Sequence, residues 1–284
     1  MKPLIGSRKA KALATHEIES FQADIAAGKT ARGRVKARGR ETSGGYGAAS
    51  RTFSTLHAIF GHVKRLGEIE ANPATGVRRM ASQPRMRRLS ADELIALGEA
   101  MRQCAQHDES ESGLAALRYL TLTGFRLNEA QKLERNWPDF DSGCVRFPDT
   151  KRGSQFRVMG NAASAVIKGR CGRGREGFVF RADGGDGHYK QLPDLIQRAT
   201  LAAELPGVTA HTLRHTFGSV ACDRGFSELT IAGLLGHGKR GVTQGYIHIE
   251  DGLRIAAERV AACIGDLLDG KRTSIRDMDI AIAA

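Results

Sequence analysis

The sequence predicts a mainly α-helical protein with a small antiparallel β-sheet, divided into two domains. Apolar residues recur every three to four positions over most of the chain, as they do on one face of an amphipathic helix. Only a few short stretches have the character of strands. The length of 284 residues, 41% of them apolar, exceeds the usual size of a single domain and provides enough material for two cores.

Two helices are predicted in the N-terminal part of the chain. In residues 15–27 the apolar side chains fall three and four positions apart, behind a possible helix cap at Thr15. Residues 48–66 show the same periodicity. Between them, residues 28–47 are rich in glycine, lysine and arginine and almost lack apolar residues, so they predict a flexible basic loop rather than part of a core.

The domain boundary is predicted at about residues 84–89, which gives domains 1–86 and 87–284. The segment before the boundary is too basic and too poor in apolar residues to belong to a core. The tetrapeptide Ser90-Ala-Asp-Glu93 that follows fits a capping box, in which the serine hydroxyl and the glutamate carboxylate bond free amides at a helix start. A new domain is therefore expected to begin here.

The second domain is predicted to be mostly helical with a small sheet. Helices are expected at residues 91–106, 112–123 and 128–135, strands at 145–147, 156–159 and 178–180, and mostly helix from there to about 269. A C-terminal tail is expected from about residue 250. It contains an amphipathic stretch at 252–268 and a terminal segment, 279–283, that alternates like a small strand.

The surplus of positive over negative charge is confined to the first third of the chain. The net charge is +12; residues 1–89 contain 18 Lys or Arg against 6 Asp or Glu, and residues 90–284 contain 25 of each. Such a concentration is typical of a surface that binds a polyanion, because each neutralised phosphate releases condensed counterions. Double-stranded DNA is the expected partner, and a solvated tail kept soluble by charge repulsion is the alternative.

The composition excludes several classes of protein. No apolar stretch approaches the roughly 18 residues needed to cross a bilayer, and the N-terminus does not read as a secretory signal. The cysteines are odd in number and far apart, which excludes a CxxC metal site and argues against a disulfide framework: Cys104, Cys144, Cys171, Cys222 and Cys263. The protein is therefore expected in a reducing cytoplasm.

Two partial motifs do not predict a cofactor or a metal. The Gly28-Lys29 pair lacks the glycine that a nucleotide-binding loop needs five positions earlier, where Ala23 stands. His211 and His215 are four residues apart and could share a helix face, but no glutamate follows His211 and no third ligand is evident. The acidic residues are dispersed, which disfavours a two-metal nuclease.

Four separate segments carry residues suited to phosphodiester chemistry. They are Thr123-Gly-Phe-Arg126, a polar turn with Lys151 between two extended runs, His211-Thr-Leu-Arg214, and Leu-Gly-His237 followed nine residues later by Tyr246. A tyrosine phenolate can attack phosphorus and form a covalent ester. Two arginines can neutralise phosphate oxygens, and a neutral imidazole, for which His211 is favoured over His237, can accept the phenolic proton.

In this order, Arg126, Lys151, His211, Arg214, His237 and Tyr246 resemble the signature of the tyrosine recombinase, or phage-type integrase, family. The resemblance covers about residues 90–250 by motif, and the basic N-terminal region loosely resembles that family's core-site-binding domain. It implies a helical DNA-binding domain followed by a mixed α+β catalytic domain. It also implies a site-specific recombinase that needs no cofactor, works through a 3′-phosphotyrosine, and uses Lys151 to protonate the leaving 5′ oxygen.

The resemblance further implies a homo-tetramer on paired DNA sites, with C-terminal tails that dock on neighbouring protomers. A tail helix that closes its own core is an equal alternative. Many phage integrases carry an arm-site-binding domain, and only about 14 residues precede the first predicted helix, so either the sites are simple or the chain is a fragment. A type IB topoisomerase and a non-catalytic DNA-binding regulator of the same fold remain as competing functions.

Overall fold

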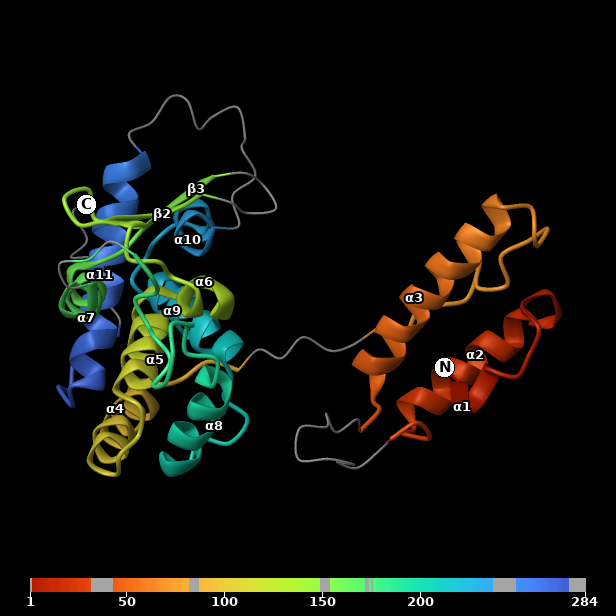
Figure 1. Ribbon diagram of the computed structural model, residues 1–284, viewed down its shortest axis with the longest axis horizontal. Helices are drawn as coiled ribbons and strands as arrows, with labels where there is room; N and C mark the ends of the chain where they lie inside the picture. The colour runs from red at the N-terminus through yellow and green to blue at the C-terminus, as the bar shows by residue number, and fades with distance from the viewer. Residues whose placement is uncertain are drawn as a thin grey trace, which may run out of the picture. The chain divides into compact units, whose positions relative to one another are not determined.

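The computed structural model describes residues 2–31, 43–81, 87–148, 154–171, 174, 176–236 and 249–275. The chain divides into two compact units, Met1–Arg85 and Met86–Ala284 (Figure 1). Both are helical, and the second contains one small antiparallel sheet, so the predicted fold class is confirmed. In the ranges just given, no helix has the length and apolar character that crossing a bilayer requires.

The first unit is built around two helices, α2 (Thr15–Ala26) and α3 (Tyr46–Arg65), close to their predicted bounds. Their apolar faces pack together in a core that includes Phe21 and Phe53. Thr15 is not the cap of α2, because the amide of Ala14 donates to the Glu17 carboxylate at 3.0 Å and the helix already begins at Thr15. A short helix, α1 (Lys2–Ile5), and a 3-10 turn, η1 (Ala10–Ala12), precede α2 and were not predicted.

The second unit contains eight of the described helices and all three described strands (Figure 1). In chain order they are α4 (Ala91–Gln106), α5 (Glu111–Thr123), α6 (Leu127–Gln131), β1 (Pro138–Asp139), β2 (Cys144–Phe147), β3 (Gln155–Val158), α7 (Asn161–Cys171), α8 (Leu192–Ala202), α9 (Ala210–Asp223), α10 (Glu228–Leu235) and α11 (Ile249–Leu268). The predicted helix 128–135 ends earlier than expected, at Gln131. The terminal segment 279–283 and most of the basic loop 28–47 lie outside the described residues.

Helix α5 is the centre of the second unit. Nearly all of its residues are buried, because α4, α7, α8, α9 and α11 all pack against it. Its Tyr119 lies edge-on to Phe125, with ring centroids 5.7 Å apart, and 5.6 Å from the ring of Phe180. A helix buried on every side positions whatever follows its C-terminus rigidly, and Arg126 follows it three residues later.

The sheet has the order β1-β2-β3, and both pairs are antiparallel. The predicted strand 178–180 is wrong, since Phe178 makes only an isolated bridge with Glu134. The amide of Val179 donates to the carbonyl of Leu133 at 2.8 Å. Isolated hydrogen bonds of this kind, and not a ladder between paired strands, hold this apolar run in the core. A short buried run has the same composition whether or not a neighbouring strand pairs with it.

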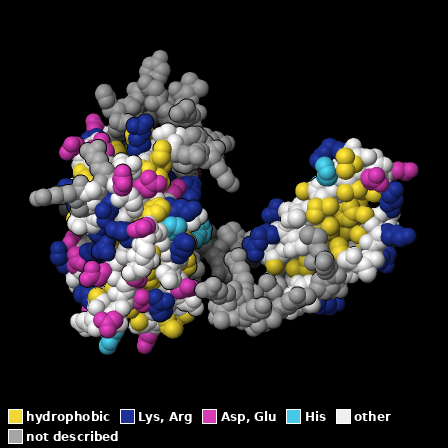
Figure 2. Space-filling view, in the orientation of Figure 1, with side chains coloured by type: hydrophobic (Ala, Val, Ile, Leu, Met, Phe, Trp, Pro, Cys, Tyr) yellow, Lys and Arg dark blue, Asp and Glu magenta, His cyan; other side chains and the backbone are white. Residues whose placement is uncertain are grey.

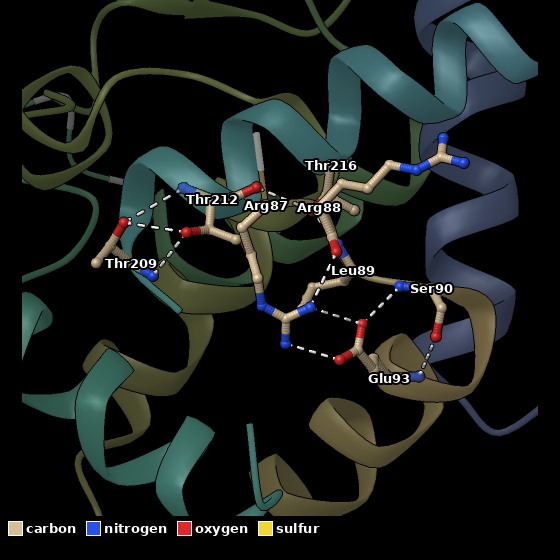
Figure 3. Close-up of polar contacts among 8 residues, drawn as sticks. All are labelled: Arg87, Arg88, Leu89, Ser90, Glu93, Thr209, Thr212 and Thr216. Atoms are coloured by element: carbon tan, nitrogen blue, oxygen red, sulfur yellow. Dashed lines mark hydrogen bonds and ion pairs between the residues drawn. The ribbon is translucent and has the colours of Figure 1, made fainter. Parts of the chain in front are cut away.

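The predicted capping box at the start of α4 is confirmed (Figure 3). The Ser90 hydroxyl accepts from the amide of Glu93 at 3.2 Å, and the Glu93 carboxylate accepts from the amide of Ser90 at 2.9 Å. The same carboxylate binds the Arg87 guanidinium at 2.7 Å. The chain therefore enters the second unit in a defined direction.

Helices α4 and α11 approach each other closely at Gly98. A Cβ atom at this position would overlap the backbone of Leu268, the last residue of α11. Replacing Gly98 with alanine should therefore lower the free energy of unfolding by about 1–3 kcal/mol, because the two helices must move apart. Urea unfolding of the purified variant measures this change.

Gly169 in α7 is the matched control for Gly98. A Cβ at Gly169 meets no atom within 4 Å, so Gly169→Ala should stabilise the protein by about 0.5–1 kcal/mol through helix propensity alone. The two alanine substitutions are thus expected to change the free energy of unfolding in opposite directions. Equal effects would show that the close approach of α4 and α11 does not limit stability.

Candidate active site

The turn after α5 presents Arg126 at the surface. Gly124 ends the helix in the left-handed conformation, with φ of 60°, and a Cβ there would lie 2.8 Å from the Phe217 ring. Only glycine fits both constraints without strain. The next residue, Phe125, is buried in the core, and Arg126 then occupies the N-cap position of α6.

Arg126 is paired with Glu129, one turn into α6. The Glu129 carboxylate accepts from the backbone amide of Arg126 at 2.8 Å and from its Nη1 at 2.7 Å. Burial alone would raise the pKa of Glu129, but the charge of Arg157 and the hydrogen bonds and charge of Arg126 outweigh it, so the pKa is lowered. The carboxylate is therefore ionised and positions the Arg126 guanidinium.

Helix α9 carries His211 and Arg214. Thr209 caps it, since its hydroxyl accepts from the amide of Thr212 at 3.3 Å while its own amide donates to the Thr212 hydroxyl at 3.1 Å (Figure 3). Thr216 lies further along the same helix and accepts from the amide of Leu89 at 2.9 Å. The middle of α9 is thus bonded to the chain segment before α4, and His211 lies in the first turn of the helix.

The guanidinium of Arg214 is buried at the junction of two helix ends. It donates to the carbonyl of Gly124 at 2.6 Å and to that of Leu235 at 2.5 Å. Burial, followed by the charges of Arg157 and Arg126, lowers its pKa to about 10. Arg214 remains cationic at neutral pH, and it connects the turn that carries Arg126 with the end of α10.

His211 and His215 form a hydrogen-bonded pair on the exposed side of α9. Their Nε2 atoms are 2.9 Å apart, so one must donate and the other accept. Burial, then the charges of His215 and Arg214, lowers the pKa of His211. No third histidine, cysteine or carboxylate joins them among the residues that the structure describes.

Three of the six predicted site residues lie around one cavity. Arg126, His211 and Arg214 line a hollow of about 770 Å³, together with parts of α8 and the loop before α9. The other three, Lys151, His237 and Tyr246, lie outside the described residues. Two predicted arginines and a predicted histidine thus border one cavity, and these residue types suit an anion with several oxygens.

Two residues of this region are not among the predicted site residues. His215 shares a helix face with His211, as their spacing of four residues predicts. Arg157 on β3 was not singled out. Its buried position follows from the register Val145↔Arg157, which puts it on the same face of the sheet as the fully buried Val145. No local pattern reveals that register.

Comparison with known proteins identifies the family of the chain. The profile of the Phage integrase family matches residues 87–252. Tyrosine recombinase XerC of Oceanobacillus iheyensis is 27% identical over 230 residues, which cover 74% of this chain and 72% of that protein. The range matched by the family profile contains Arg126, His211 and Arg214.

Two solved structures share the fold. XerH recombinase in a post-cleavage complex with palindromic difH DNA has a TM-score of 0.59 and 15% identity, and covers 87% of this chain and 69% of that one. A lambda integrase tetramer bound to a Holliday junction has a TM-score of 0.56 and 17% identity, with 82% and 66% covered. By its family profile, its relatives and its fold, the chain belongs to the phage integrase family, the tyrosine recombinases, which are DNA strand transferases of site-specific recombination.

Proposed function

We propose that this protein is a site-specific DNA recombinase that cuts and rejoins strands through a covalent 3′-phosphotyrosine at Tyr246. The observation that carries the proposal is the convergence of Arg126, His211 and Arg214, from two distant segments, on one cavity. A phosphodiester placed there would meet two cations and an imidazole. Those are the groups that phosphoryl transfer without a metal ion requires.

The choice of Tyr246 as nucleophile is supported by the surroundings of the other tyrosines. The chain contains four. Tyr119 and Tyr189 are buried, and burial raises the pKa of both phenols, which disfavours the attacking phenolate. Tyr46 belongs to the first unit. Tyr246 follows His237 by nine residues in the sequence, at the spacing that the family resemblance implies for the nucleophile.

In the proposed reaction Tyr246 Oη attacks phosphorus and the bond to the 5′ oxygen breaks. His211 takes the phenolic proton, and Lys151 gives a proton to the leaving 5′ oxygen. Arg126, Arg214 and His237 bind the non-bridging oxygens as negative charge accumulates. Attack by the 5′ hydroxyl of a partner strand reverses these steps, and the ester retains the energy of the broken bond, so no cofactor is consumed.

The first unit is proposed to bind the DNA. It contains most of the surplus positive charge, and Figure 2 shows Lys and Arg side chains at several places on the unit built by α2 and α3. The DNA complexes of XerH and lambda integrase support a duplex partner. The lambda integrase tetramer bound to a Holliday junction supports assembly of four protomers on paired sites. The proposed place of action is the cytoplasm, on DNA.

Covalent trapping tests the proposed function. The full chain is incubated with nicked duplexes taken from DNA that flanks its own gene, and the products are separated under denaturing conditions and sequenced. We expect protein attached to a 3′ end at a defined position, and strand exchange between two such sites. Plasmid relaxation without exchange would indicate a topoisomerase, and failure to form any adduct would indicate a non-catalytic DNA-binding protein.

The rate of adduct formation should rise with pH. A base must be neutral, and since the pKa of His211 is lowered, half of the maximal rate is expected below about pH 6.5, the ordinary pKa of histidine. His215→Gln removes one cause of that shift, so its curve should move to higher pH. His107→Gln, an exposed change elsewhere in the unit, should leave the curve in place. A curve for His215→Gln identical to that of the parent would show that His215 does not lower the pKa of His211, and a rate independent of pH between about 5 and 8 would exclude His211 as the base.

A further inference from the structure

Arg157 is a buried arginine that the proposed mechanism does not use. It lies on β3, and its side chain is 2% exposed. Among the residues that the structure describes, no atom accepts a hydrogen bond from its Nε, Nη1 or Nη2. The guanidinium lies over the ring of Phe125, 4.8 Å from the centroid, and a Cβ on Gly236 would overlap it. It thus lies between the turn that carries Arg126 and the end of α10.

An arginine in this state is costly for the fold. Removing a guanidinium from water without hydrogen-bonding partners costs several kcal/mol, more than one aromatic contact returns. Burial accordingly lowers the pKa of Arg157 to about 10. An apolar side chain of similar volume would pack against Phe125 without this cost. The burial of Arg157 therefore indicates a function in the site and not a contribution to stability.

Glu129 is the carboxylate that this charge faces. Arg157 Nη1 lies 3.9 Å from Glu129 Oε2, just beyond a direct hydrogen bond. The other oxygen, Oε1, is bound by Arg126 Nη1 at 2.7 Å. Glu129 thus has one close cation, Arg126, which is about half exposed, and one buried cation at the limit of contact.

In this arrangement Glu129 and a DNA phosphate compete for the guanidinium of Arg126, and Arg157 can weaken the hold of Glu129. For Arg126 to bind a DNA phosphate, its guanidinium has to leave a carboxylate that attracts it and repels the phosphate. Arg126, Arg157, Arg214 and Glu129 together carry a net charge of +2, and without Arg157 they would carry +1. A phosphodiester has one negative charge and its five-coordinate transition state gains a second, so the larger value matches the reacting group.

We propose that Arg157 is a positioning residue of the strand-transfer site, which holds Glu129 when Arg126 turns from that carboxylate to the scissile phosphate. Its role rests on the proposed function, because it requires a phosphate to bind at Arg126. On DNA binding, Arg157 and Glu129 close to a direct ion pair and Arg126 is released. Arg157 itself does not contact the DNA.

The test compares Arg157→Met in two backgrounds, the unaltered chain and Glu129→Gln. In the unaltered chain the variant should slow covalent adduct formation by about 10- to 100-fold, below the loss expected for a group that contacts the transition state. In the Glu129→Gln background the same change should cost less than about threefold, since no carboxylate then retains Arg126. Equal losses in both backgrounds would overturn the proposal, because Arg157 would then act independently of Glu129.

Three further measurements separate positioning from a structural role. Arg157→Lys, which keeps the charge, should recover part of the rate, whereas Arg146→Met on the exposed side of neighbouring β2 should change it less than twofold. The melting temperature of Arg157→Met should be equal to or above that of the parent. A lower melting temperature together with a proportional loss of DNA binding would indicate a role in packing and contradict the proposal.

A titration followed by NMR makes failure of this inference distinguishable from failure of the proposed function. With 13C-labelled glutamate, the Glu129 carboxyl signal, assigned from its absence in Glu129→Gln, should titrate at higher pH in Arg157→Met than in the parent. An unchanged titration overturns the inference even if the parent cleaves DNA. Absence of adduct from the parent overturns the proposed function, whatever the titration shows.

Discussion

Tyr246→Phe should abolish covalent attachment to DNA while leaving DNA affinity within about twofold. The substitution retains the ring and removes only the oxygen that is proposed to attack phosphorus, so no ester can form. Binding should persist because it depends mainly on phosphate contacts from basic residues spread over both units. Nicked duplexes separated under denaturing conditions measure the adduct, and fluorescence anisotropy measures the affinity.

The other tyrosines provide matched controls for this experiment. Tyr46→Phe removes an exposed hydroxyl in the first unit and should not change adduct formation. Tyr189→Phe removes a buried one, and its rate should stay within about threefold of the parent. An adduct that persists in Tyr246→Phe, or disappears in Tyr189→Phe, would show that a different residue is the nucleophile.

Arg214→Lys should slow adduct formation by about 100- to 1000-fold. Lysine keeps a positive charge but cannot bind two acceptors with one planar group. The same substitution weakens two buried hydrogen bonds, those to the carbonyls of Gly124 and Leu235. The free energy of unfolding should therefore fall by about 1–3 kcal/mol. Single-turnover kinetics and urea unfolding measure the two effects separately.

Arg88→Lys is the control for Arg214. Arg88 forms an exposed ion pair with Asp223 and lies outside the cavity, so its replacement should change the rate less than twofold and stability by less than about 0.5 kcal/mol. If Arg214→Lys cleaves at the parental rate, its guanidinium is structural only. A loss of rate with unchanged stability would show that the two carbonyls have other donors when DNA is absent.

Helices were predicted well where a segment has an apolar face. Helix α4 begins and ends at its predicted residues, and α5 differs by one, because the 3.6-residue period and the Ser90 cap are both local signals. The sheet was harder. Strand β1 has only two residues, and the run 178–180 is buried coil, since pairing depends on residues far away in the sequence.

For the candidate site, the types of residue and their order in the chain could be predicted from the sequence. The residues that contact them in space could not. The segments around Arg126 and Arg214 carry recognisable motifs with side chains that the proposed chemistry needs. Nothing local indicates that Arg214 binds the carbonyl of Gly124, 90 residues away, or that Arg157 lies beside Glu129. The signal for His215 was present in its helical spacing from His211.

The sequence by itself determined the helices and the concentration of charge in the first third, because each of these depends on side chains near one another in the chain. Its motifs predict which groups react. The tertiary structure decided which cations share Glu129, how deeply Arg157 and Arg214 are buried, and how their pKa values change. Electrostatic energies depend on distance and on exclusion of water, and both are set by how α5, α6, β3, α9 and the end of α10 come together.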